Sequence, residues 1–298
     1  MAENNRWTGK TGGGKFGQRF LLFILKYVNV TAIYPILVIV IPFYFIFGRK
    51  GRRAIYHYFN SILGYPPLKA FFATFKNHYI FGKVVLDKFA MDAGRADQFK
   101  LDAGLLDFFA GMAKSEEGCI VAGSHIGNFE LCGHAMVQDR KVINSVVYGG
   151  ETADVQRGRA DSMKDYNVRI SPIKDDMSHL FSIIGALERG EFVTIVCDRI
   201  SGSKKYLDID FLGHPAKFPL GPFVLAASSN VKMLSVFLIK GRGLKYESLV
   251  FPLEGVAEGS VREKAKALAV SYVRSLENVL RLYPHQWFNY FQFWDMKN

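Results

Sequence analysis

One stretch of the chain combines residue types that can carry out proton-transfer chemistry. It reads VAGSHIGNFE and places His125 and Glu130 five residues apart. The apolar run before it predicts a strand that ends near Gly123. Asn128 is a favoured N-cap, and Glu130 falls in the first turn of the helix that follows, where negative charge is stabilised. His125 is therefore expected on the turn between a strand and a helix.

This position suits a general base. A carboxylate bonded to one imidazole nitrogen fixes the histidine tautomer and raises the basicity of the other nitrogen. His125 held by Glu130 could take a proton from a hydroxyl or amine that attacks a thioester. A lone histidine at a strand end is more often structural, but the complete string is more specific than a lone histidine.

Other catalytic classes have weaker support. Ser124 lies beside His125, but the chain has no GxSxG elbow for a hydrolase or thioesterase. Residues 9–16 resemble a phosphate-binding loop, yet they end in Phe16 where a metal-holding Ser or Thr is required. The three cysteines, Cys119, Cys132 and Cys197, form no CxxC pair. We expect reduced structural thiols, no metal site and no bound cofactor.

From about residue 99, short apolar runs alternate with helical stretches, which predicts an α/β sheet with helices on both faces. The expected strands are 119–123, 142–149, 168–173, 192–198, 232–240 and 246–253, and the expected helices are 128–139, 153–166, 176–190, 218–230 and 261–283. Residues 54–92 also have helical periodicity, with a break at 64–67.

An apolar segment precedes the helical region. Residues 30–47 carry no charge, and basic residues stand on both sides of them. A spanning helix needs about 20 apolar residues, so a single span, a re-entrant or interfacial anchor, and a buried helix all remain open. We expect a flexible basic N-terminus over residues 1–19, a membrane anchor over 20–53 and a globular domain over 54–298.

The net charge of +11, from 38 basic and 27 acidic residues, predicts an acidic partner. Anionic lipid and an acidic protein both fit. Nucleic acid fits by charge alone, since the chain contains no recognition motif for it.

Several segments resemble a known family. SHIGNFE resembles the HxxxxD/E motif of the glycerolipid acyltransferases, and the closest branch is the late acyltransferases of lipid A biosynthesis. GALERGEFVTIVCDR, FLGHPAKFPLGPFVLA and PHQWF are similar to further segments of that branch, in the same order. The similarity covers about residues 115–290 and implies a mixed central sheet flanked by helices, with an N-terminal membrane-anchoring helix.

The resemblance also implies roles for the first motif. His125 would be the general base and Glu130 its partner, while Gly127 and Asn128 would shape the turn and the substrate site.

Four more residues would contact substrate by the same resemblance. Asp198 and Arg199 stand where the family usually has Asp-Gln, so Arg199 is a departure. This cation could bind an acceptor carboxylate or phosphate, stabilise an oxyanion, or form a structural ion pair. Arg169 aligns loosely with an arginine of the family, and Gly221 lies in the segment expected to shape the acyl pocket.

The implied activity is fatty acyl transfer from acyl carrier protein, or from acyl-CoA, to a hydroxyl or amine of a lipid-like acceptor. The implied location is the bacterial inner membrane, in contact with phospholipid, with the catalytic domain on the cytoplasmic face. Gly149 and Gly150 replace the Arg-Pro typical of the lipid A enzymes, which questions lipid A as the acceptor. An amino-acid lipid, a polyene-type pigment and a non-catalytic membrane scaffold are the alternatives.

Overall fold

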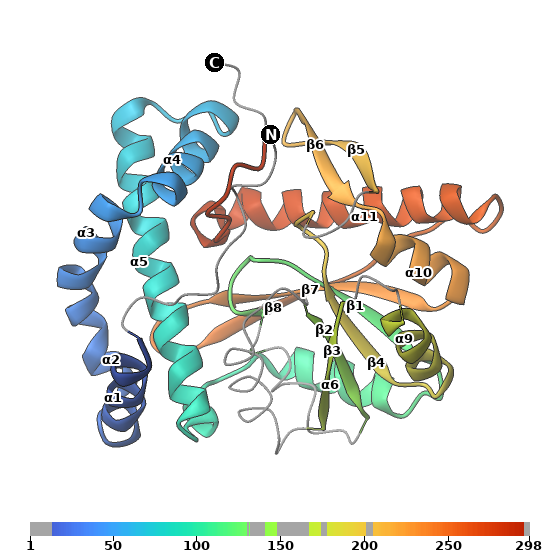
Figure 1. Ribbon diagram of the computed structural model, residues 1–298, viewed down its shortest axis with the longest axis horizontal. Coiled ribbons are helices and arrows are strands. Elements are labelled where there is room, and N and C mark those ends of the chain that lie inside the picture. The colour runs from blue at the N-terminus through green and yellow to red at the C-terminus, as the bar shows by residue number, and fades with distance from the viewer. Residues whose placement is uncertain are drawn as a thin grey trace.

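The computed structural model describes residues 14–129, 131, 141–147, 167–173, 178–200 and 205–294. At its centre is a six-stranded sheet in the order β3-β2-β4-β1-β7-β8 (Figure 1). The pairs from β3 to β7 are parallel, and β8 is antiparallel to β7. The bounds are β1 Cys119–Gly123, β2 Ile143–Val147, β3 Val168–Pro172, β4 Phe192–Val196, β7 Lys232–Lys240 and β8 Tyr246–Pro252. The predicted α/β fold with a mixed central sheet is confirmed.

The central strands have apolar residues on both faces because helices cover both faces. In β1, Ile120 and Ala122 face one core cluster, and Cys119 and Val121 face the other. The first cluster includes buried residues of α9, α10 and α11, and the second includes Phe109 of α6. Figure 1 shows α11 and α6 on opposite sides of the sheet. The bounds are α6 Ala103–Ala113, α9 His179–Glu188, α10 Gly221–Ser229 and α11 Val261–Leu282.

The N-terminal helices form a separate layer beside the sheet (Figure 1). Their bounds are α1 Gly14–Tyr27, α2 Val30–Ile33, the short helix η1 Tyr34–Ile36, α3 Leu37–Phe47, α4 Arg49–His57, the π-helical turn η2 Tyr58–Ile62 and α5 Pro67–Asp92. α1 begins at Gly14, within the stretch over residues 1–19 that was expected to be a flexible N-terminus, and that expectation stays a prediction. Residues 1–13 lie outside the described part. By length and composition, residues 30–47 could cross a membrane, and 33% of this segment is buried against the rest of the protein.

The predicted helix over 218–230 begins later than expected. Residues up to Pro219 belong to a hairpin of β5, Tyr206–Phe211, and β6, His214–Pro219. Leu212 and Gly213 connect the two strands with positive φ angles of 56° and 78°. The helix expected over residues 153–166 lies outside the described residues. The helix expected over residues 128–139 is described only at residues 128, 129 and 131.

A buried ion pair joins the helical layer to the sheet. Asp87 of α5 lies 3.1 Å from the Lys240 ammonium at the end of β7. The hydroxyls of Tyr34 and Tyr246 donate to the two oxygens of the same carboxylate, each at 2.5 Å. Burial raises the pKa of Asp87 and lowers that of Lys240, and the opposite charge of each partner counters this effect. The pairing and the two tyrosine donors thus offset part of the cost of burying these two groups.

Loss of this charge should be costly. We expect Asp87→Asn to lower the free energy of unfolding by about 3–5 kcal/mol, because Lys240 would be left buried without a counter-charge. Denaturant unfolding followed by circular dichroism measures the change. Asp97→Asn removes a carboxyl from an exposed position, and its effect should stay within about 0.5 kcal/mol. Equal stabilities for the two variants would show that the buried pair does not stabilise the fold.

Candidate active site

Two parallel strands bring His125 and Asp198 together. β1 and β4 pair in register, with Gly123 opposite Val196. His125 follows Gly123 by two residues, and Asp198 follows Val196 by two residues. Both side chains therefore emerge at the carboxyl edge of the sheet, where open α/β sheets commonly place their ligands.

The Asp198 carboxylate is fully buried and receives three hydrogen bonds. Its Oδ1 lies 2.7 Å from Nδ1 of His125, and its Oδ2 accepts the backbone N–H of His125 at 2.8 Å. The indole N–H of Trp287 donates to the same Oδ2 at 3.1 Å. The His125 side chain is 31% exposed, whereas that of Asp198 is 0% exposed. One side of the imidazole is thus bound to a buried anion, and part of the ring is open to solvent.

Asp198 remains ionised in this setting. Burial alone would raise the pKa of its carboxyl group, but the charge and hydrogen bonds of His125, together with the nearby Arg199, lower that pKa to about 2. An ionised carboxylate can only accept, so Nδ1 of His125 must carry a proton. In the neutral imidazole, Nε2 then has the free lone pair, as a general base requires.

The residue expected to partner His125 was Glu130, which lies outside the described residues. Among the described residues, the partner of the His125 ring is Asp198, which the sequence placed in the substrate-binding group. The sequence signal for this pair is that Asp198 follows β4 and His125 follows β1, each by two residues. Reading it required the pairing of the two strands, which the sequence pattern does not specify.

The C-terminal strap, residues 284–290, holds the turn that carries His125. The backbone N–H of Gly127 donates to the Gln286 carbonyl at 2.9 Å, and the N–H of Phe288 donates to the His125 carbonyl at 2.8 Å. Trp287 adds its bond to Asp198. The sequence placed this segment in the family pattern but assigned it no role.

Asn128 fixes the other side of the turn. Its backbone N–H donates to Leu238 of β7 at 2.8 Å, and its side-chain oxygen accepts the N–H of Leu131 at 3.3 Å, as an N-cap does. Its side-chain amide donates to the Tyr246 hydroxyl at 3.3 Å. Because Tyr246 also donates to Asp87, the buried ion pair of the fold is connected to the His125 turn. Asn128 therefore orients the turn, and its expected contact with substrate stays a prediction.

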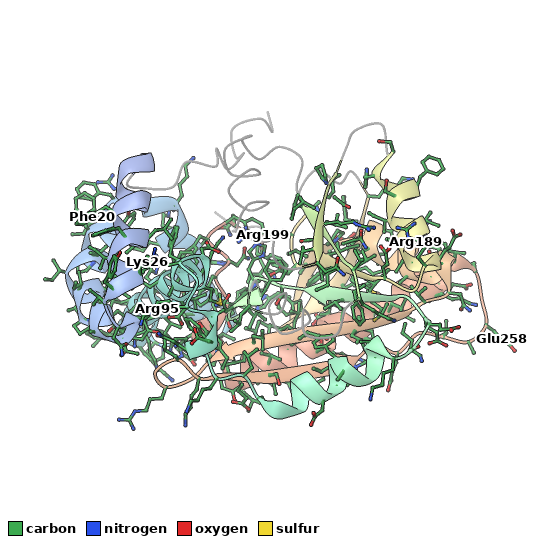
Figure 2. The ribbon with its side chains drawn as sticks, turned by 90° about the horizontal axis from the view of Figure 1, so that it is seen from below. Phe20, Lys26, Arg95, Arg189, Arg199 and Glu258 are labelled. Carbon is green, nitrogen blue, oxygen red and sulfur yellow. The ribbon has the colours of Figure 1, made fainter. Side chains whose placement is uncertain are left out.

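Arg199 is partly buried beside this site. It donates through Nη2 to the Phe288 carbonyl at 3.2 Å, and its guanidinium lies 5.2 Å from the centre of the Phe291 ring. Burial lowers the pKa of Arg199, while the charge of Asp198 opposes that shift. Within the described residues its Nε has no hydrogen-bond partner. Figure 2 shows Arg199 between the N-terminal helices and the sheet. Among the described residues, Arg199 therefore binds the C-terminal strap through the Phe288 carbonyl.

The structure separates Arg169 from the other candidates. Arg169 is the second residue of β3, and its Nη1 lies 3.4 Å from Glu191, which precedes β4. Both positions belong to the amino edge of these parallel strands, opposite the edge that carries His125. Arg189, which binds the same Glu191, lies well apart from Arg199 in Figure 2. Arg169 therefore lies away from His125, and its expected contact with substrate stays a prediction.

Gly221 is the first residue of α10. A side chain added there would meet nothing within 4 Å. The described contacts do not join Gly221 to His125 or Asp198, so its place at the acyl pocket stays a prediction.

The comparison with known proteins decides the family. The family model described as bacterial lipid A biosynthesis acyltransferase matches residues 79–294. The chain belongs to this family. The match covers the whole central sheet, both residues of the His125–Asp198 pair and the C-terminal strap. It begins within α5, so α1 to α4 lie outside the part that this match defines.

Two mycobacterial relatives are named phosphatidylinositol mannoside acyltransferase. The one from Mycobacterium tuberculosis H37Rv is 21% identical over 174 residues, which is 58% of this chain and 54% of the relative. The one from Mycolicibacterium smegmatis is 22% identical over 202 residues, which is 66% of this chain and 63% of the relative. The chain thus spans between about half and two thirds of the length of these relatives.

Substitution of Asp198 tests the tautomer directly. In Asp198→Asn the amide oxygen can still accept the backbone N–H of His125 and the Trp287 N–H, but the NH2 group would face Nδ1. The proton would then move to Nε2 and remove the free lone pair. We expect kcat to fall about 10³–10⁴-fold with the fold retained. Steady-state kinetics measures the loss, and ¹⁵N shifts of His125 report the tautomer. An active variant with an unprotonated Nδ1 would contradict this role.

Gly127 should tolerate no side chain. It has a φ of +63°, and an added Cβ would lie 2.0 Å from the Leu238 carbonyl oxygen. The left-handed backbone alone costs about 1–2 kcal/mol for other residues. We expect Gly127→Ala to lower the unfolding free energy by at least about 2 kcal/mol and to impair activity. Gly111→Ala is the control: nothing lies within 4 Å of its added Cβ, and the position is inside helix α6, so this variant should be at least as stable as the wild type in thermal unfolding.

Proposed function

We propose that this protein transfers a fatty acyl chain from acyl carrier protein, or from coenzyme A, to a hydroxyl or amine of a lipid-like acceptor. The single observation that carries the proposal is the pairing of the partly exposed His125 with the buried, ionised Asp198 at the carboxyl edge of the sheet. Membership of the lipid A biosynthesis acyltransferase family supports this reaction class.

The chemistry follows from the His125 tautomer. Nε2 removes the proton of the acceptor O–H or N–H as the oxygen or nitrogen attacks the carbonyl carbon of the acyl thioester. The imidazolium that forms is stabilised by the Asp198 carboxylate. When the tetrahedral intermediate collapses, the C–S bond breaks and the leaving thiolate takes the proton from Nε2. The products are an ester or amide and a free thiol, and this sequence uses no metal or bound cofactor.

The acceptor is proposed to be a membrane glycolipid. The family model names lipid A biosynthesis, and the two relatives are named for phosphatidylinositol mannoside. Both names point to glycolipid acceptors, although their headgroups differ. The net charge of +11 favours an acidic donor such as acyl carrier protein.

The proposed location is the cytoplasmic face of a bacterial inner membrane. The apolar segment over residues 30–47 supports membrane attachment. Cys119 and Cys197 are buried free thiols, which suit a reducing compartment.

Lipid mass spectrometry on the native host with and without the gene tests the proposal. We expect one acylated lipid to disappear on deletion and to return with the wild-type gene. His125→Ala should not restore it, because removal of a general base lowers the rate about 10²–10⁴-fold. His214→Ala, in the β5–β6 hairpin, is the matched control and should restore the lipid.

Two outcomes would contradict the proposal. Restoration of the lipid by His125→Ala would place catalysis elsewhere or favour a non-catalytic scaffold. An unchanged lipid profile on deletion would exclude a lipid acceptor, and the search would move to pigments and other non-lipid extracts.

A further inference from the structure

The N-terminal helices carry many exposed apolar side chains. They come from α1, from α3 and from the first turns of α5, so they extend well beyond the apolar segment recognised in the sequence. Six that represent this surface, which we call the apolar wedge, are Phe20, Phe23, Ile39, Phe47, Leu68 and Phe72, exposed by 56%, 62%, 79%, 68%, 71% and 62%. An apolar surface spread over several elements indicates an interaction site.

The segment that could span a membrane is packed along α5. Near its start, the Tyr34 hydroxyl donates to Asp87. In its middle, Leu37 and Ile41 lie so close to Gly82 that an added Cβ there would be 3.1–3.3 Å from them. The two helices therefore run side by side in opposite directions.

The contact continues to the end of α3. The ring of Phe45 packs against Phe71 and His78 of α5, with ring centres 5.4 Å and 5.3 Å apart. Arg52 of α4 donates to the Phe45 carbonyl at 2.7 Å. In Figure 1, α3 accordingly lies on the outer side of α5, away from the sheet.

The other end of the apolar segment is bound to the same folded body. Arg95, which follows α5, donates through Nη1 to the carbonyls of Leu25, Lys26 and Val28 at 3.1–3.2 Å. Figure 2 shows Lys26 and Arg95 close together in the helical layer. Since residues 25–28 precede the apolar segment and α4 follows it, both of its ends stay on the body that carries the active site.

The part of α5 from Lys76 to Asp87 cannot enter the bilayer core without cost. Its inner face is bound to the strap, because the Asn77 amide donates to the carbonyls of His285 and Trp287 at 3.0 Å and 2.8 Å. The stretch of α5 that runs beside α3 also carries Lys76, Lys83 and the buried Asp87. A membrane-crossing α3 would take these charges to hydrocarbon depth, or would have to leave all its contacts with α5.

We infer that the apolar wedge enters a single leaflet of an anionic phospholipid membrane, so that α3 lies against the protein and does not cross the bilayer. Charge complementarity supports this occupant. Arg49, Lys50, Arg53 and Lys69 are exposed beside Phe47 and Leu68, where cationic side chains can meet anionic headgroups.

The arrangement also has a consequence for catalysis, and this consequence rests on the proposed function. α5 connects the apolar wedge to the strap, and the strap binds both His125 and Asp198. The wedge therefore fixes the active site at the membrane surface, where the hydroxyl or amine of a lipid acceptor is presented. Binding of the wedge to lipid requires no catalysis and can be measured separately.

Flotation with phosphatidylcholine vesicles, with and without about a third phosphatidylglycerol, tests the surface. We expect stronger binding to the anionic vesicles. Leu68→Ser/Phe72→Ser should weaken vesicle binding at least about tenfold, since two exposed apolar side chains leave the lipid. Phe181→Ser, on α9 and 81% exposed in the wild type, is the control and should bind normally. If the α5 double variant bound as tightly as this control, α5 would not touch lipid and the inference would fail.

A topology measurement tests the single leaflet. With a protease-cleavable tag at each end of the full chain in inside-out membrane vesicles, we expect both tags to be cleaved from the same side. Opposite sidedness would establish a spanning helix and overturn the inference. The His125→Ala variant separates this inference from the proposed function when its vesicle binding and its acyl transfer are both measured. Normal binding without acyl transfer supports the membrane inference and the proposed mechanism. Normal binding with normal acyl transfer would refute only the proposed mechanism.

Discussion

The buried carboxylate of Asp198 is the contact on which the active site depends. It accepts the ring and the backbone N–H of His125 and the indole N–H of Trp287, so one anion joins β4, the turn after β1 and the C-terminal strap. A buried anion without such donors is expensive. Displacement of either segment would therefore both disturb the histidine and leave an uncompensated charge in the interior. The same contacts set the tautomer and the position of the ring, which couples stability and chemistry in a single cluster.

Features that depend on local sequence could be predicted. The apolar runs of β1, β4 and β7 and the amphipathic pattern of α11 agree with the observed elements. The position of His125 on a turn after a buried strand, and the N-cap at Asn128, also follow from the local pattern. In each case the signal lies within a few residues, because burial and capping act over that distance.

Features that depend on contacts across the fold could not be predicted. Asp198 binds His125 because β4 happens to be the neighbour of β1, and no pattern in either strand specifies that pairing. The roles of Trp287 and Tyr246 are likewise defined by partners far away in the chain. A local strand signal was missed in the β5–β6 hairpin, where Leu207, Ile209 and Phe211 alternate with the exposed Asp208 and Asp210. The partner role expected for Glu130 stays a prediction.

The hydrogen bond between Tyr34 and Asp87 has a practical consequence for protein production. Removal of the apolar N-terminal segment is a common way to obtain a soluble fragment, but a chain trimmed to begin at Pro67 would lose the Tyr34 donor and the carbonyls that Arg95 binds. It would also uncover Phe75 and Gly82 of α5, which now lie beneath α3. Such a fragment would lose the apolar surface of α3 but expose the apolar face of α5, and it would aggregate. Detergent or lipid added to the intact chain is the better route to a well-behaved sample.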